Sequence, residues 1–154
     1  MGTIKDALIG RAFAKLLRVS EKETGNKNFS LNRRKKMLKV YCYSKCSTCK
    51  KALKWLEEHN IEFTTIDIKS DHPDEETLRG YYKLSGLSLK RFFNTSGIPY
   101  RELGLAKKLP EMSEDEQLAL LATDGMLVKR PLVVGDDFVL TGFREEEWAD
   151  RLSR

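Results

Sequence analysis

The sequence of 154 residues contains no hydrophobic run of the roughly 18 residues that a membrane-spanning helix needs. Its first residues also lack the apolar stretch and the small-residue cleavage site of a secretory signal. We therefore expect a protein that neither enters a membrane nor is exported, and the cytoplasm is the expected compartment. An apolar content of 40% is enough for one globular domain with its own core.

Cysteine and histidine are scarce, with three and two copies in the chain. In a reducing compartment three cysteines rarely build a disulfide framework, so close spacing indicates catalysis, redox sensing or metal binding. The histidines, His59 and His72, fall at an expected helix end and in an expected loop, and they supply no convincing set of zinc ligands. We therefore expect no bound metal and no other bound cofactor.

The excess of positive charge is confined to the first part of the chain. Residues 1–36 contain ten Lys or Arg against three Asp or Glu, a net charge of +7. Residues 37–154 contain 18 basic and 20 acidic residues, a net charge of −2. Because affinity for nucleic acid comes from clustered cations, the second segment gives no reason to expect direct nucleic-acid binding. We predict a basic, disordered extension over residues 1–36 and a folded domain over residues 37–154.

Regular patterns begin at Met37. Leu38, Val40 and Cys42 alternate with Lys and Tyr residues, the period of two that is typical of a strand. After residue 46 the period becomes helical, and residues 63–68 form a second expected strand. A strand, a helix and a strand in this order predict two parallel neighbouring strands.

The segment that follows the second expected strand is predicted to be helical. Helices are expected to begin near Pro73, Ser88 and Ser113, the last with a capping box to Glu116. A hairpin over residues 132–140 and a last helix from Glu145 then follow. The predicted fold class is therefore α/β, with a thioredoxin-like core in the order β-α-β and β-β-α and an inserted helical region between the two halves.

The Cys46-Ser-Thr-Cys49 turn lies where the first strand ends and the first helix begins. Free amide groups at a helix N-terminus stabilise a thiolate, and Lys45, Lys50 and Lys51 add positive potential. Cys46 is therefore the expected nucleophile, with a lowered pKa. Cys49 falls on the apolar side of the helix and is the expected resolving thiol, which attacks a mixed disulfide on Cys46. The two cysteines are thus the predicted catalytic residues and the predicted redox disulfide.

The third cysteine leaves an alternative open. Cys42, Cys46 and Cys49 together have the Cys-x3-Cys-x2-Cys spacing with which radical-SAM enzymes hold an iron–sulfur cluster. Strand alternation instead places Cys42 on the inward face, and residues 37–154 are few for a barrel of βα units. We therefore favour a buried, inert thiol at Cys42. Purely structural roles for Cys46 and Cys49 are a further alternative that the position of the turn disfavours.

Arg130 and Pro131 come directly before the third expected strand. In a thioredoxin-like arrangement a proline at this position faces the cysteine turn, and we predict a cis peptide bond there. Arg130 is predicted to offer its guanidinium to an anion held near Cys46.

Several blocks of sequence resemble the ArsC-like group of the thioredoxin superfamily, in the same order along the chain. These blocks cover residues 46–52, 89–97, 100–104, 124–131 and 142–148. The group includes glutaredoxin-coupled arsenate reductases, Spx-type regulators and YffB-like proteins. The resemblance runs from about Met37 to Leu152 and implies a thioredoxin fold.

In the arsenate reductases of this group one cysteine attacks arsenate and three arginines surround the oxyanion. The resemblance places Cys46 at the nucleophile and Arg130 at one arginine. Lys90, with Arg91 beside it, stands at the place of the first arginine, and the place of the third falls at Phe143 or Arg144, depending on a shift of one residue. It therefore implies a site for substrate or anion made of Lys90, Arg130, Pro131 and Arg144. A lysine cannot hold an oxyanion with two parallel hydrogen bonds, which departs from the arsenate reductase pattern.

The resemblance implies two functions. The first is an enzyme, an arsenate reductase-like thiol–disulfide oxidoreductase that acts on a small thiol, an oxyanion or a redox partner protein. Glutathione with glutaredoxin, or thioredoxin, is then the expected electron donor. The second is an Spx-type redox-sensing transcriptional regulator that binds RNA polymerase. A second cysteine at position 49 resembles the Spx-type pattern rather than that of the arsenate reductases. Residues 92–97 resemble the reductase-like branch, so the enzyme is favoured, and in both cases we expect a monomer.

Overall fold

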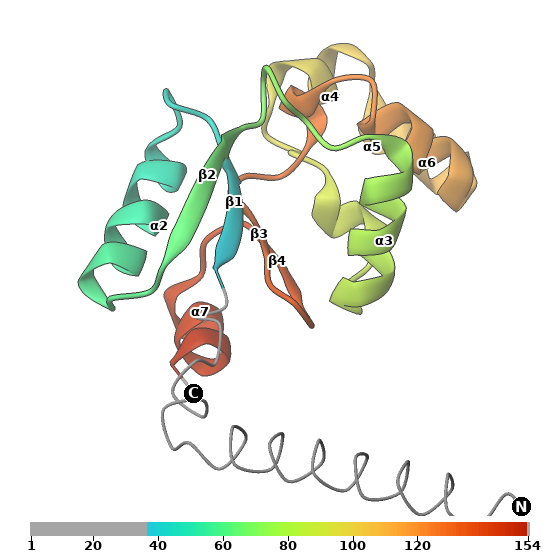
Figure 1. Ribbon diagram of the computed structural model, residues 1–154. Coiled ribbons are helices and arrows are strands. Elements are labelled where there is room, and N and C mark those ends of the chain that lie inside the picture. Colours follow the sequence, from blue (N-terminus) through green and yellow to red (C-terminus); the bar gives the residue numbers. More distant parts are fainter. Residues whose placement is uncertain (1–36, 154) are drawn as a thin grey trace, which may run out of the picture. The chain divides into compact units, whose positions relative to one another are not determined.

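A four-stranded mixed sheet forms the centre of the domain, and helices cover both of its faces (Figure 1). This computed structural model describes residues 37–153, so the predicted extension over residues 1–36 lies outside the described residues. The strands are β1 Leu38–Cys42, β2 Phe63–Asp67, β3 Leu132–Val134 and β4 Val139–Thr141. The α-helices are α2 Ser47–Glu58, α3 Glu75–Ser85, α4 Ile98–Glu102, α5 Leu105–Lys108, α6 Glu114–Leu121 and α7 Glu145–Leu152. Short 3-10 helices are η1 Leu89–Phe92, η2 Leu109–Glu111 and η3 Gly125–Leu127.

The sheet has the strand order β2-β1-β3-β4. β1 runs parallel to β2, with Val40 opposite Thr65, and α2 makes the connection between them. β3 runs antiparallel to β1 and to β4, with Val133 between Val40 and Leu140. The chain therefore has the predicted α/β fold, in which α3 to α6 are inserted between the β-α-β and β-β-α halves of a thioredoxin-like core.

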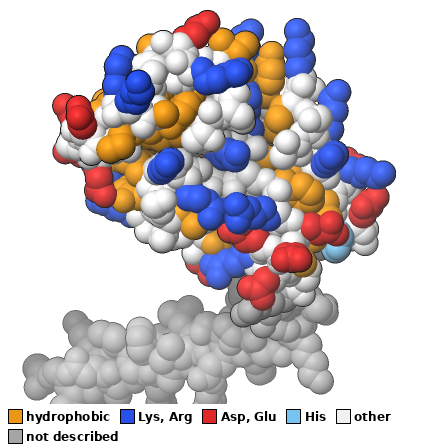
Figure 2. Space-filling model, turned by 180° about the vertical axis from the view of Figure 1, so that it is seen from behind, with side chains coloured by type: hydrophobic (Ala, Val, Ile, Leu, Met, Phe, Trp, Pro, Cys, Tyr) orange, Lys and Arg blue, Asp and Glu red, His pale blue; other side chains and the backbone are white. Residues whose placement is uncertain are grey.

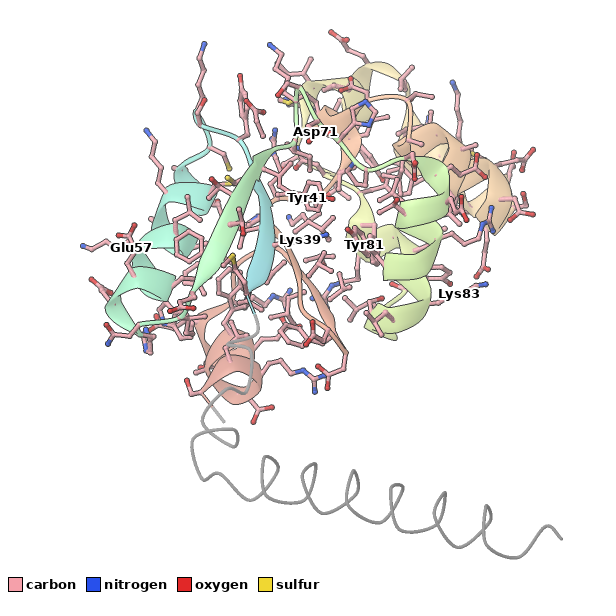
Figure 3. The ribbon with its side chains drawn as sticks, viewed as in Figure 1. Lys39, Tyr41, Glu57, Asp71, Tyr81 and Lys83 are labelled. Carbon is pink, nitrogen blue, oxygen red and sulfur yellow. The ribbon has the colours of Figure 1, made fainter. Side chains whose placement is uncertain are left out.

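Alternation along β1 sends side chains to two buried faces. Leu38 and Val40 pack with α2 and α7, whereas Tyr41 packs with the inserted helices. Tyr41 is only 7% exposed, and its hydroxyl lies 3.2 Å from that of Tyr81 on α3. The two tyrosines point toward one another across the space between β1 and α3 (Figure 3). Burial, the hydrogen bond with Tyr81 and nearby negative charge together hold the pKa of Tyr41 well above its usual value.

Helix α6 begins at the capping box that the sequence predicts. The Ser113 hydroxyl accepts the N–H of Glu116 at 3.2 Å, and the Glu116 carboxylate accepts the N–H of Ser113 at 2.7 Å. Helix α3 begins in a similar way, because the Asp74 carboxylate accepts the N–H of Thr77 at 2.8 Å. The starts of these two inserted helices therefore follow from short-range side-chain chemistry.

Helices α4 and α5 are not predicted from the sequence. Pro99 lies in the first turn of α4, and Gly104 adopts a left-handed conformation with φ of 64° between the two helices. Each helix is at most five residues long, too short for the apolar period to appear. Packing of Tyr100 and Leu105 into the core holds them in place.

The surface mixes charged and apolar side chains. On the face that Figure 2 shows, Lys and Arg side chains are spread over the molecule, and hydrophobic side chains are exposed between them. Ile98, at the start of α4, is the most exposed large hydrophobic side chain of the described residues, at 63%. No helix within residues 37–153 is both long and apolar enough to cross a membrane.

Candidate active site

The cysteine turn lies between β1 and α2, as the sequence predicts. Cys46 is the residue before α2; its N–H donates to the carbonyl of Tyr43 at 3.0 Å, and its carbonyl accepts the N–H of Lys50 at 3.2 Å. The first turn of α2 contains no acidic residue. The partial positive charge of the helix N-terminus therefore acts on the Cys46 thiol without a competing carboxylate in that turn. This thiol is half-exposed, so a substrate can reach it.

The surroundings of Cys46 favour its thiolate. Partial burial by itself would raise the pKa of Cys46. Hydrogen bonds from the amide and the thiol of Cys49, the positive charge of Arg130 and the amide of Thr48 outweigh burial, and the pKa is lowered. The predicted nucleophile is therefore the more acidic member of the Cys46–Cys49 pair.

Cys49 has the opposite character. Its side chain is 1% exposed, and its sulfur accepts the N–H of Tyr43 at 3.5 Å. Burial raises the pKa of Cys49 to about 12, and the neighbouring Cys46 thiolate acts in the same direction. At neutral pH Cys49 is a neutral thiol that donates to Cys46. The two thiols therefore differ in depth and in charge, as a nucleophile and a resolving thiol must.

Cys42 lies at the end of β1 on the side of α2 and α7. The sequence predicts a buried thiol, but in the structure Cys42 is only half-buried. Burial, followed by the charges of Asp67 and Cys46, raises its pKa. The strand end is open enough to leave the thiol partly accessible, because the chain turns there toward α2. Within residues 37–153 no three His, Cys, Asp or Glu side chains are grouped as they would be to hold a metal ion.

The Arg130–Pro131 peptide bond is cis, as predicted. Pro131 is buried, and its carbonyl accepts the N–H of Gly142 at 2.9 Å. The Arg130 guanidinium lies over the ring of Tyr43, 5.2 Å from its centroid, and donates to the sulfur of Met126 at 3.0 Å. Arg130 is thus held from two sides in a position from which its charge acts on Cys46.

A cleft of about 730 Å³ opens beside Cys46. Its lining contains Cys46 together with three of the predicted anion-binding residues, Lys90, Arg130 and Arg144. Lys90 and Arg144 are exposed, and Arg130 is half-buried. Pro131, the fourth of these residues, is buried and does not belong to the lining. The structure therefore brings together residues from four separate segments of the sequence.

The cleft contains further polar groups outside the predicted set of anion-binding residues. Lys129 and Arg91 also line it, Arg91 with an ion pair to Glu147 at 3.6 Å, and the lining includes no Asp or Glu. Thr141, at the end of β4, lines the cleft with a side chain that is 4% exposed. The one signal available for Lys129 was its place beside Arg130, but such a lysine reads equally well as a solvated surface residue.

Comparisons with known proteins agree with this architecture. Residues 41–151 match the ArsC family. The uncharacterized protein YusI of Bacillus subtilis is 55% identical over 113 residues, which are 73% of this chain and 96% of that protein. The crystal structure of a possible arsenate reductase from Streptococcus mutans is 46% identical, with a TM-score of 0.67 over 73% of this chain and 97% of that one.

A regulator is also among the relatives. The global transcriptional regulator Spx 2 of Bacillus cereus is 26% identical over 111 residues, which are 72% of this chain and 83% of that protein. The family match covers most of the described domain and includes the cysteine turn, the Arg130–Pro131 segment and the residues that line the cleft. This chain therefore belongs to the ArsC family.

Proposed function

We propose that this ArsC-family protein is a thiol–disulfide oxidoreductase in which Cys46 is the nucleophile and Cys49 the resolving thiol. The observation that carries this proposal is the contrast between the two cysteines. Cys46 is half-exposed at a basic cleft and has a lowered pKa, whereas Cys49 is buried and its pKa is about 12. Two-step exchange requires one reactive thiolate and a neighbouring thiol that stays protonated until the mixed disulfide has formed.

The proposed reaction is the reduction of a substrate disulfide. The Cys46 thiolate attacks one sulfur, forms a mixed disulfide with that half of the substrate and releases the other half as a thiolate. Cys49 then loses its proton and attacks the Cys46 sulfur, which releases the second half and leaves a Cys46–Cys49 disulfide. The substrate gains two electrons, and the leaving thiolates take up two protons. A thiol reductant, either glutathione with glutaredoxin or thioredoxin, returns the protein to its dithiol form.

The charges of the cleft favour an anionic substrate. Arg130 is tied to the chemistry because its charge acts on Cys46, while Lys90 and Arg144 line the cleft and are exposed. Arg130 can hold an anion with two parallel hydrogen bonds, whereas Lys90 supplies a single compact charge. This set supports general attraction of anions, in keeping with the name of the Streptococcus mutans relative, more strongly than tight capture of arsenate.

A redox-sensing regulator is the second candidate. It is favoured by the similarity to Spx 2 over 111 residues and by the presence of both cysteines in one turn. In that function the Cys46–Cys49 disulfide would report the redox state and change the affinity for RNA polymerase, without turnover of a substrate.

Activity measured with cysteine variants tests the proposal. Consumption of NADPH is followed with glutathione, glutathione reductase, glutaredoxin and a small disulfide or arsenate, and in parallel with thioredoxin and its reductase, each rate taken above that without the protein. Cys46→Ser should abolish turnover, and Cys49→Ser should accumulate a mixed disulfide on Cys46. Cys42→Ser is the matched control and should keep its activity. Binding to RNA polymerase that changes on oxidation, without turnover, would contradict the enzyme and support the regulator.

A further inference from the structure

Helix α2 carries its charges in the order that a helix disfavours. Lysines lie near its N-terminus and glutamates near its C-terminus, all of them exposed: Lys50, Lys51, Lys54, Glu57 and Glu58. A helix is partially positive at its N-terminus and partially negative at its C-terminus, so each group faces an end of its own sign. The other helices of eight or more residues within residues 37–153, α3, α6 and α7, all have acidic residues in their first turn. The order on α2 therefore costs stability, which is typical of residues that serve a function.

The first lysines of this segment are available to another molecule. Lys45, Lys50 and Lys51 are exposed, and within residues 37–153 none of them forms an ion pair. Lys54, by contrast, pairs with Glu58 at 3.7 Å. Lys45, Lys50 and Lys51, which we call the lysine face, also lie outside the lining of the cleft. A small substrate held in the cleft therefore does not account for them.

The lowered pKa of Cys46 does not account for the lysine face either. Burial by itself raises this pKa, and hydrogen bonds with Cys49, followed by the charge of Arg130, outweigh burial. Stabilisation of the thiolate therefore rests on the cysteine turn and on Arg130, and the lysine face is left for a different role.

The start of α4 adds an apolar side chain near the same thiol. Ile98 is 63% exposed, and it lines the cleft together with Cys46 and with Thr48 from the first turn of α2. An exposed apolar side chain with charged residues around it is typical of a surface that another protein covers. Ile98 and the lysine face therefore offer an apolar contact and a charged rim beside the one half-exposed thiol of the pair.

We propose that the lysine face and Ile98 form the docking surface for a dithiol protein whose own surface is acidic around its reactive cysteine. The inference rests on the proposed function, because this protein would reduce the Cys46–Cys49 disulfide that the function forms. Opposite charges on the two surfaces steer their encounter and set their orientation. A nucleic acid fits less well, because its evenly spaced phosphates would follow α2 beyond the lysines and meet Glu57 and Glu58. A localised acidic patch on a protein meets the lysines alone.

The exchange on this surface is a reduction by two electrons. One thiolate of the docked protein attacks the sulfur of Cys46, which is half-exposed, and the Cys46–Cys49 bond breaks. Cys49 leaves as a thiolate and takes up a proton. The second thiol of the docked protein loses its proton, attacks the sulfur that its partner thiol shares with Cys46, and releases the Cys46 thiolate. The docked protein ends as a disulfide, and this chain returns to its dithiol form.

Two reductants of different size test the docking surface. The protein is oxidised with diamide and then reduced either by a thioredoxin with an acidic surface or by dithiothreitol, and acid-quenched samples are weighed by intact mass spectrometry. The double variant Lys50→Glu with Lys51→Glu should slow reduction by thioredoxin about tenfold or more at low ionic strength, because attraction between the surfaces becomes repulsion. Its rate with dithiothreitol should change less than about threefold, because this small reagent needs no docking. Both reagents attack as thiolates, so an effect on the disulfide itself cancels in the ratio of the two rates.

Matched variants and salt give the controls. Lys107→Glu with Lys108→Glu reverses two adjacent exposed lysines on α5, outside the cleft lining, and should leave the ratio unchanged. Ile98→Ser should lower the thioredoxin rate on the order of fivefold through lost apolar contact, whereas Leu103→Ser, also exposed but outside the lining, should not. Salt should slow thioredoxin with the unmodified protein and have no such effect on the variant of α2. That variant should unfold at no lower temperature than the unmodified protein, because acidic residues suit the start of a helix.

An unchanged ratio in the variant of α2, or an equal change in the control on α5, would overturn the docking surface. A protein that turns over a disulfide through Cys46 and Cys49 but shows either result keeps its function and loses the docking surface. A protein whose disulfide is reduced with the expected difference, but that turns over no substrate, keeps the docking surface and loses the enzyme. Binding to RNA polymerase that the variant of α2 abolishes, with an unchanged ratio, would instead give the lysine face to the second candidate function.

Discussion

Three thiols lie close together at the end of β1 and the start of α2, and their surroundings give them different chemistry. Cys49 is the deepest, and burial raises its pKa to about 12. Burial also raises the pKa of Cys42, where Asp67 adds to the effect. Cys46 is the one of the three whose hydrogen bonds and cationic neighbour outweigh partial burial. Position at a helix N-terminus, rather than residue type, therefore selects the reactive thiol.

We predict that Cys46 reacts first with iodoacetamide and that Arg130 contributes to this reactivity. The rate should rise as pH rises through the pKa of Cys46, with a midpoint below the value of about 8.5 for an unperturbed thiol. Arg130→Met removes one of the causes that lower this pKa and leaves burial in place, so the midpoint should move to higher pH. Mass spectrometry of labelled peptides across a pH series measures the midpoint at each cysteine.

Arg101→Met is the control, because Arg101 is exposed on α4 and does not line the cleft. Its midpoint should equal that of the unmodified protein. Equal labelling of all three cysteines, or an Arg130→Met midpoint that does not move, would show that the thiolate at position 46 is not stabilised as the geometry indicates.

Part of the site can be predicted from the residues themselves. The cysteine turn and the cis Arg130–Pro131 bond were accessible because local patterns and the order of elements determine them. Lys129 and Thr141 were not, because neither residue type is diagnostic and only the packing of β4 against Pro131 brings them to the cleft. The half-exposed state of Cys42 was missed for a similar reason, since strand alternation gives the face of a residue but not its depth at a strand end.

Two glycines, Gly80 and Gly125, differ in how closely the backbone around them packs against its neighbours. Gly80 lies inside α3, and a Cβ atom added there would meet no atom within 4 Å. Gly125, at the start of η3, packs directly on the carbonyl of Ile68, which follows β2, and on the side chain of His72. The first glycine therefore has no packing role, whereas the second allows η3 to approach the end of β2.

We predict opposite effects on stability when these two glycines are replaced by alanine. Gly80→Ala should stabilise the protein by about 0.5–1 kcal/mol, because alanine favours a helix interior over glycine. Gly125→Ala should destabilise it by about 1–3 kcal/mol, because the added methyl group overlaps a backbone carbonyl that cannot rotate away. Urea unfolding followed by far-UV circular dichroism gives both free energies. The same sign of change in the two variants would contradict the packing described for η3.

The sequence also predicts the order of helices and strands well. Both halves of the core, the capping box of α6 and the hairpin of β3 and β4 appear in the structure at the expected places. The short helices between Ile98 and Lys108 were inaccessible, because tertiary packing of Tyr100 and Leu105 rather than local period forms them. Burial of Tyr41 was likewise hidden, because it depends on the inserted helices that cover the second face of the sheet.

For the whole molecule, the depth of Cys49 determines how oxidation alters the protein. Cys46 is the accessible member of the pair, so a second molecule can reach it, but Cys49 is three residues away in the same helix start and reacts without diffusion. Intramolecular closure should therefore be faster than formation of a covalent dimer at micromolar concentration.

We predict that mild oxidation with diamide gives a monomer that has lost one pair of hydrogens. The intact mass should fall by about 2 Da, and two of three thiols should disappear, as exchange within one pair requires. In Cys49→Ser the resolving thiol is absent, so Cys46 should instead accumulate as a mixed disulfide or a covalent dimer. Cys42→Ser should behave like the unmodified protein, because Cys42 lies on β1 outside the pair. Intact mass spectrometry with non-reducing electrophoresis distinguishes these products, and a Cys49→Ser variant that still loses 2 Da as a monomer would place the disulfide partner of Cys46 elsewhere in the chain.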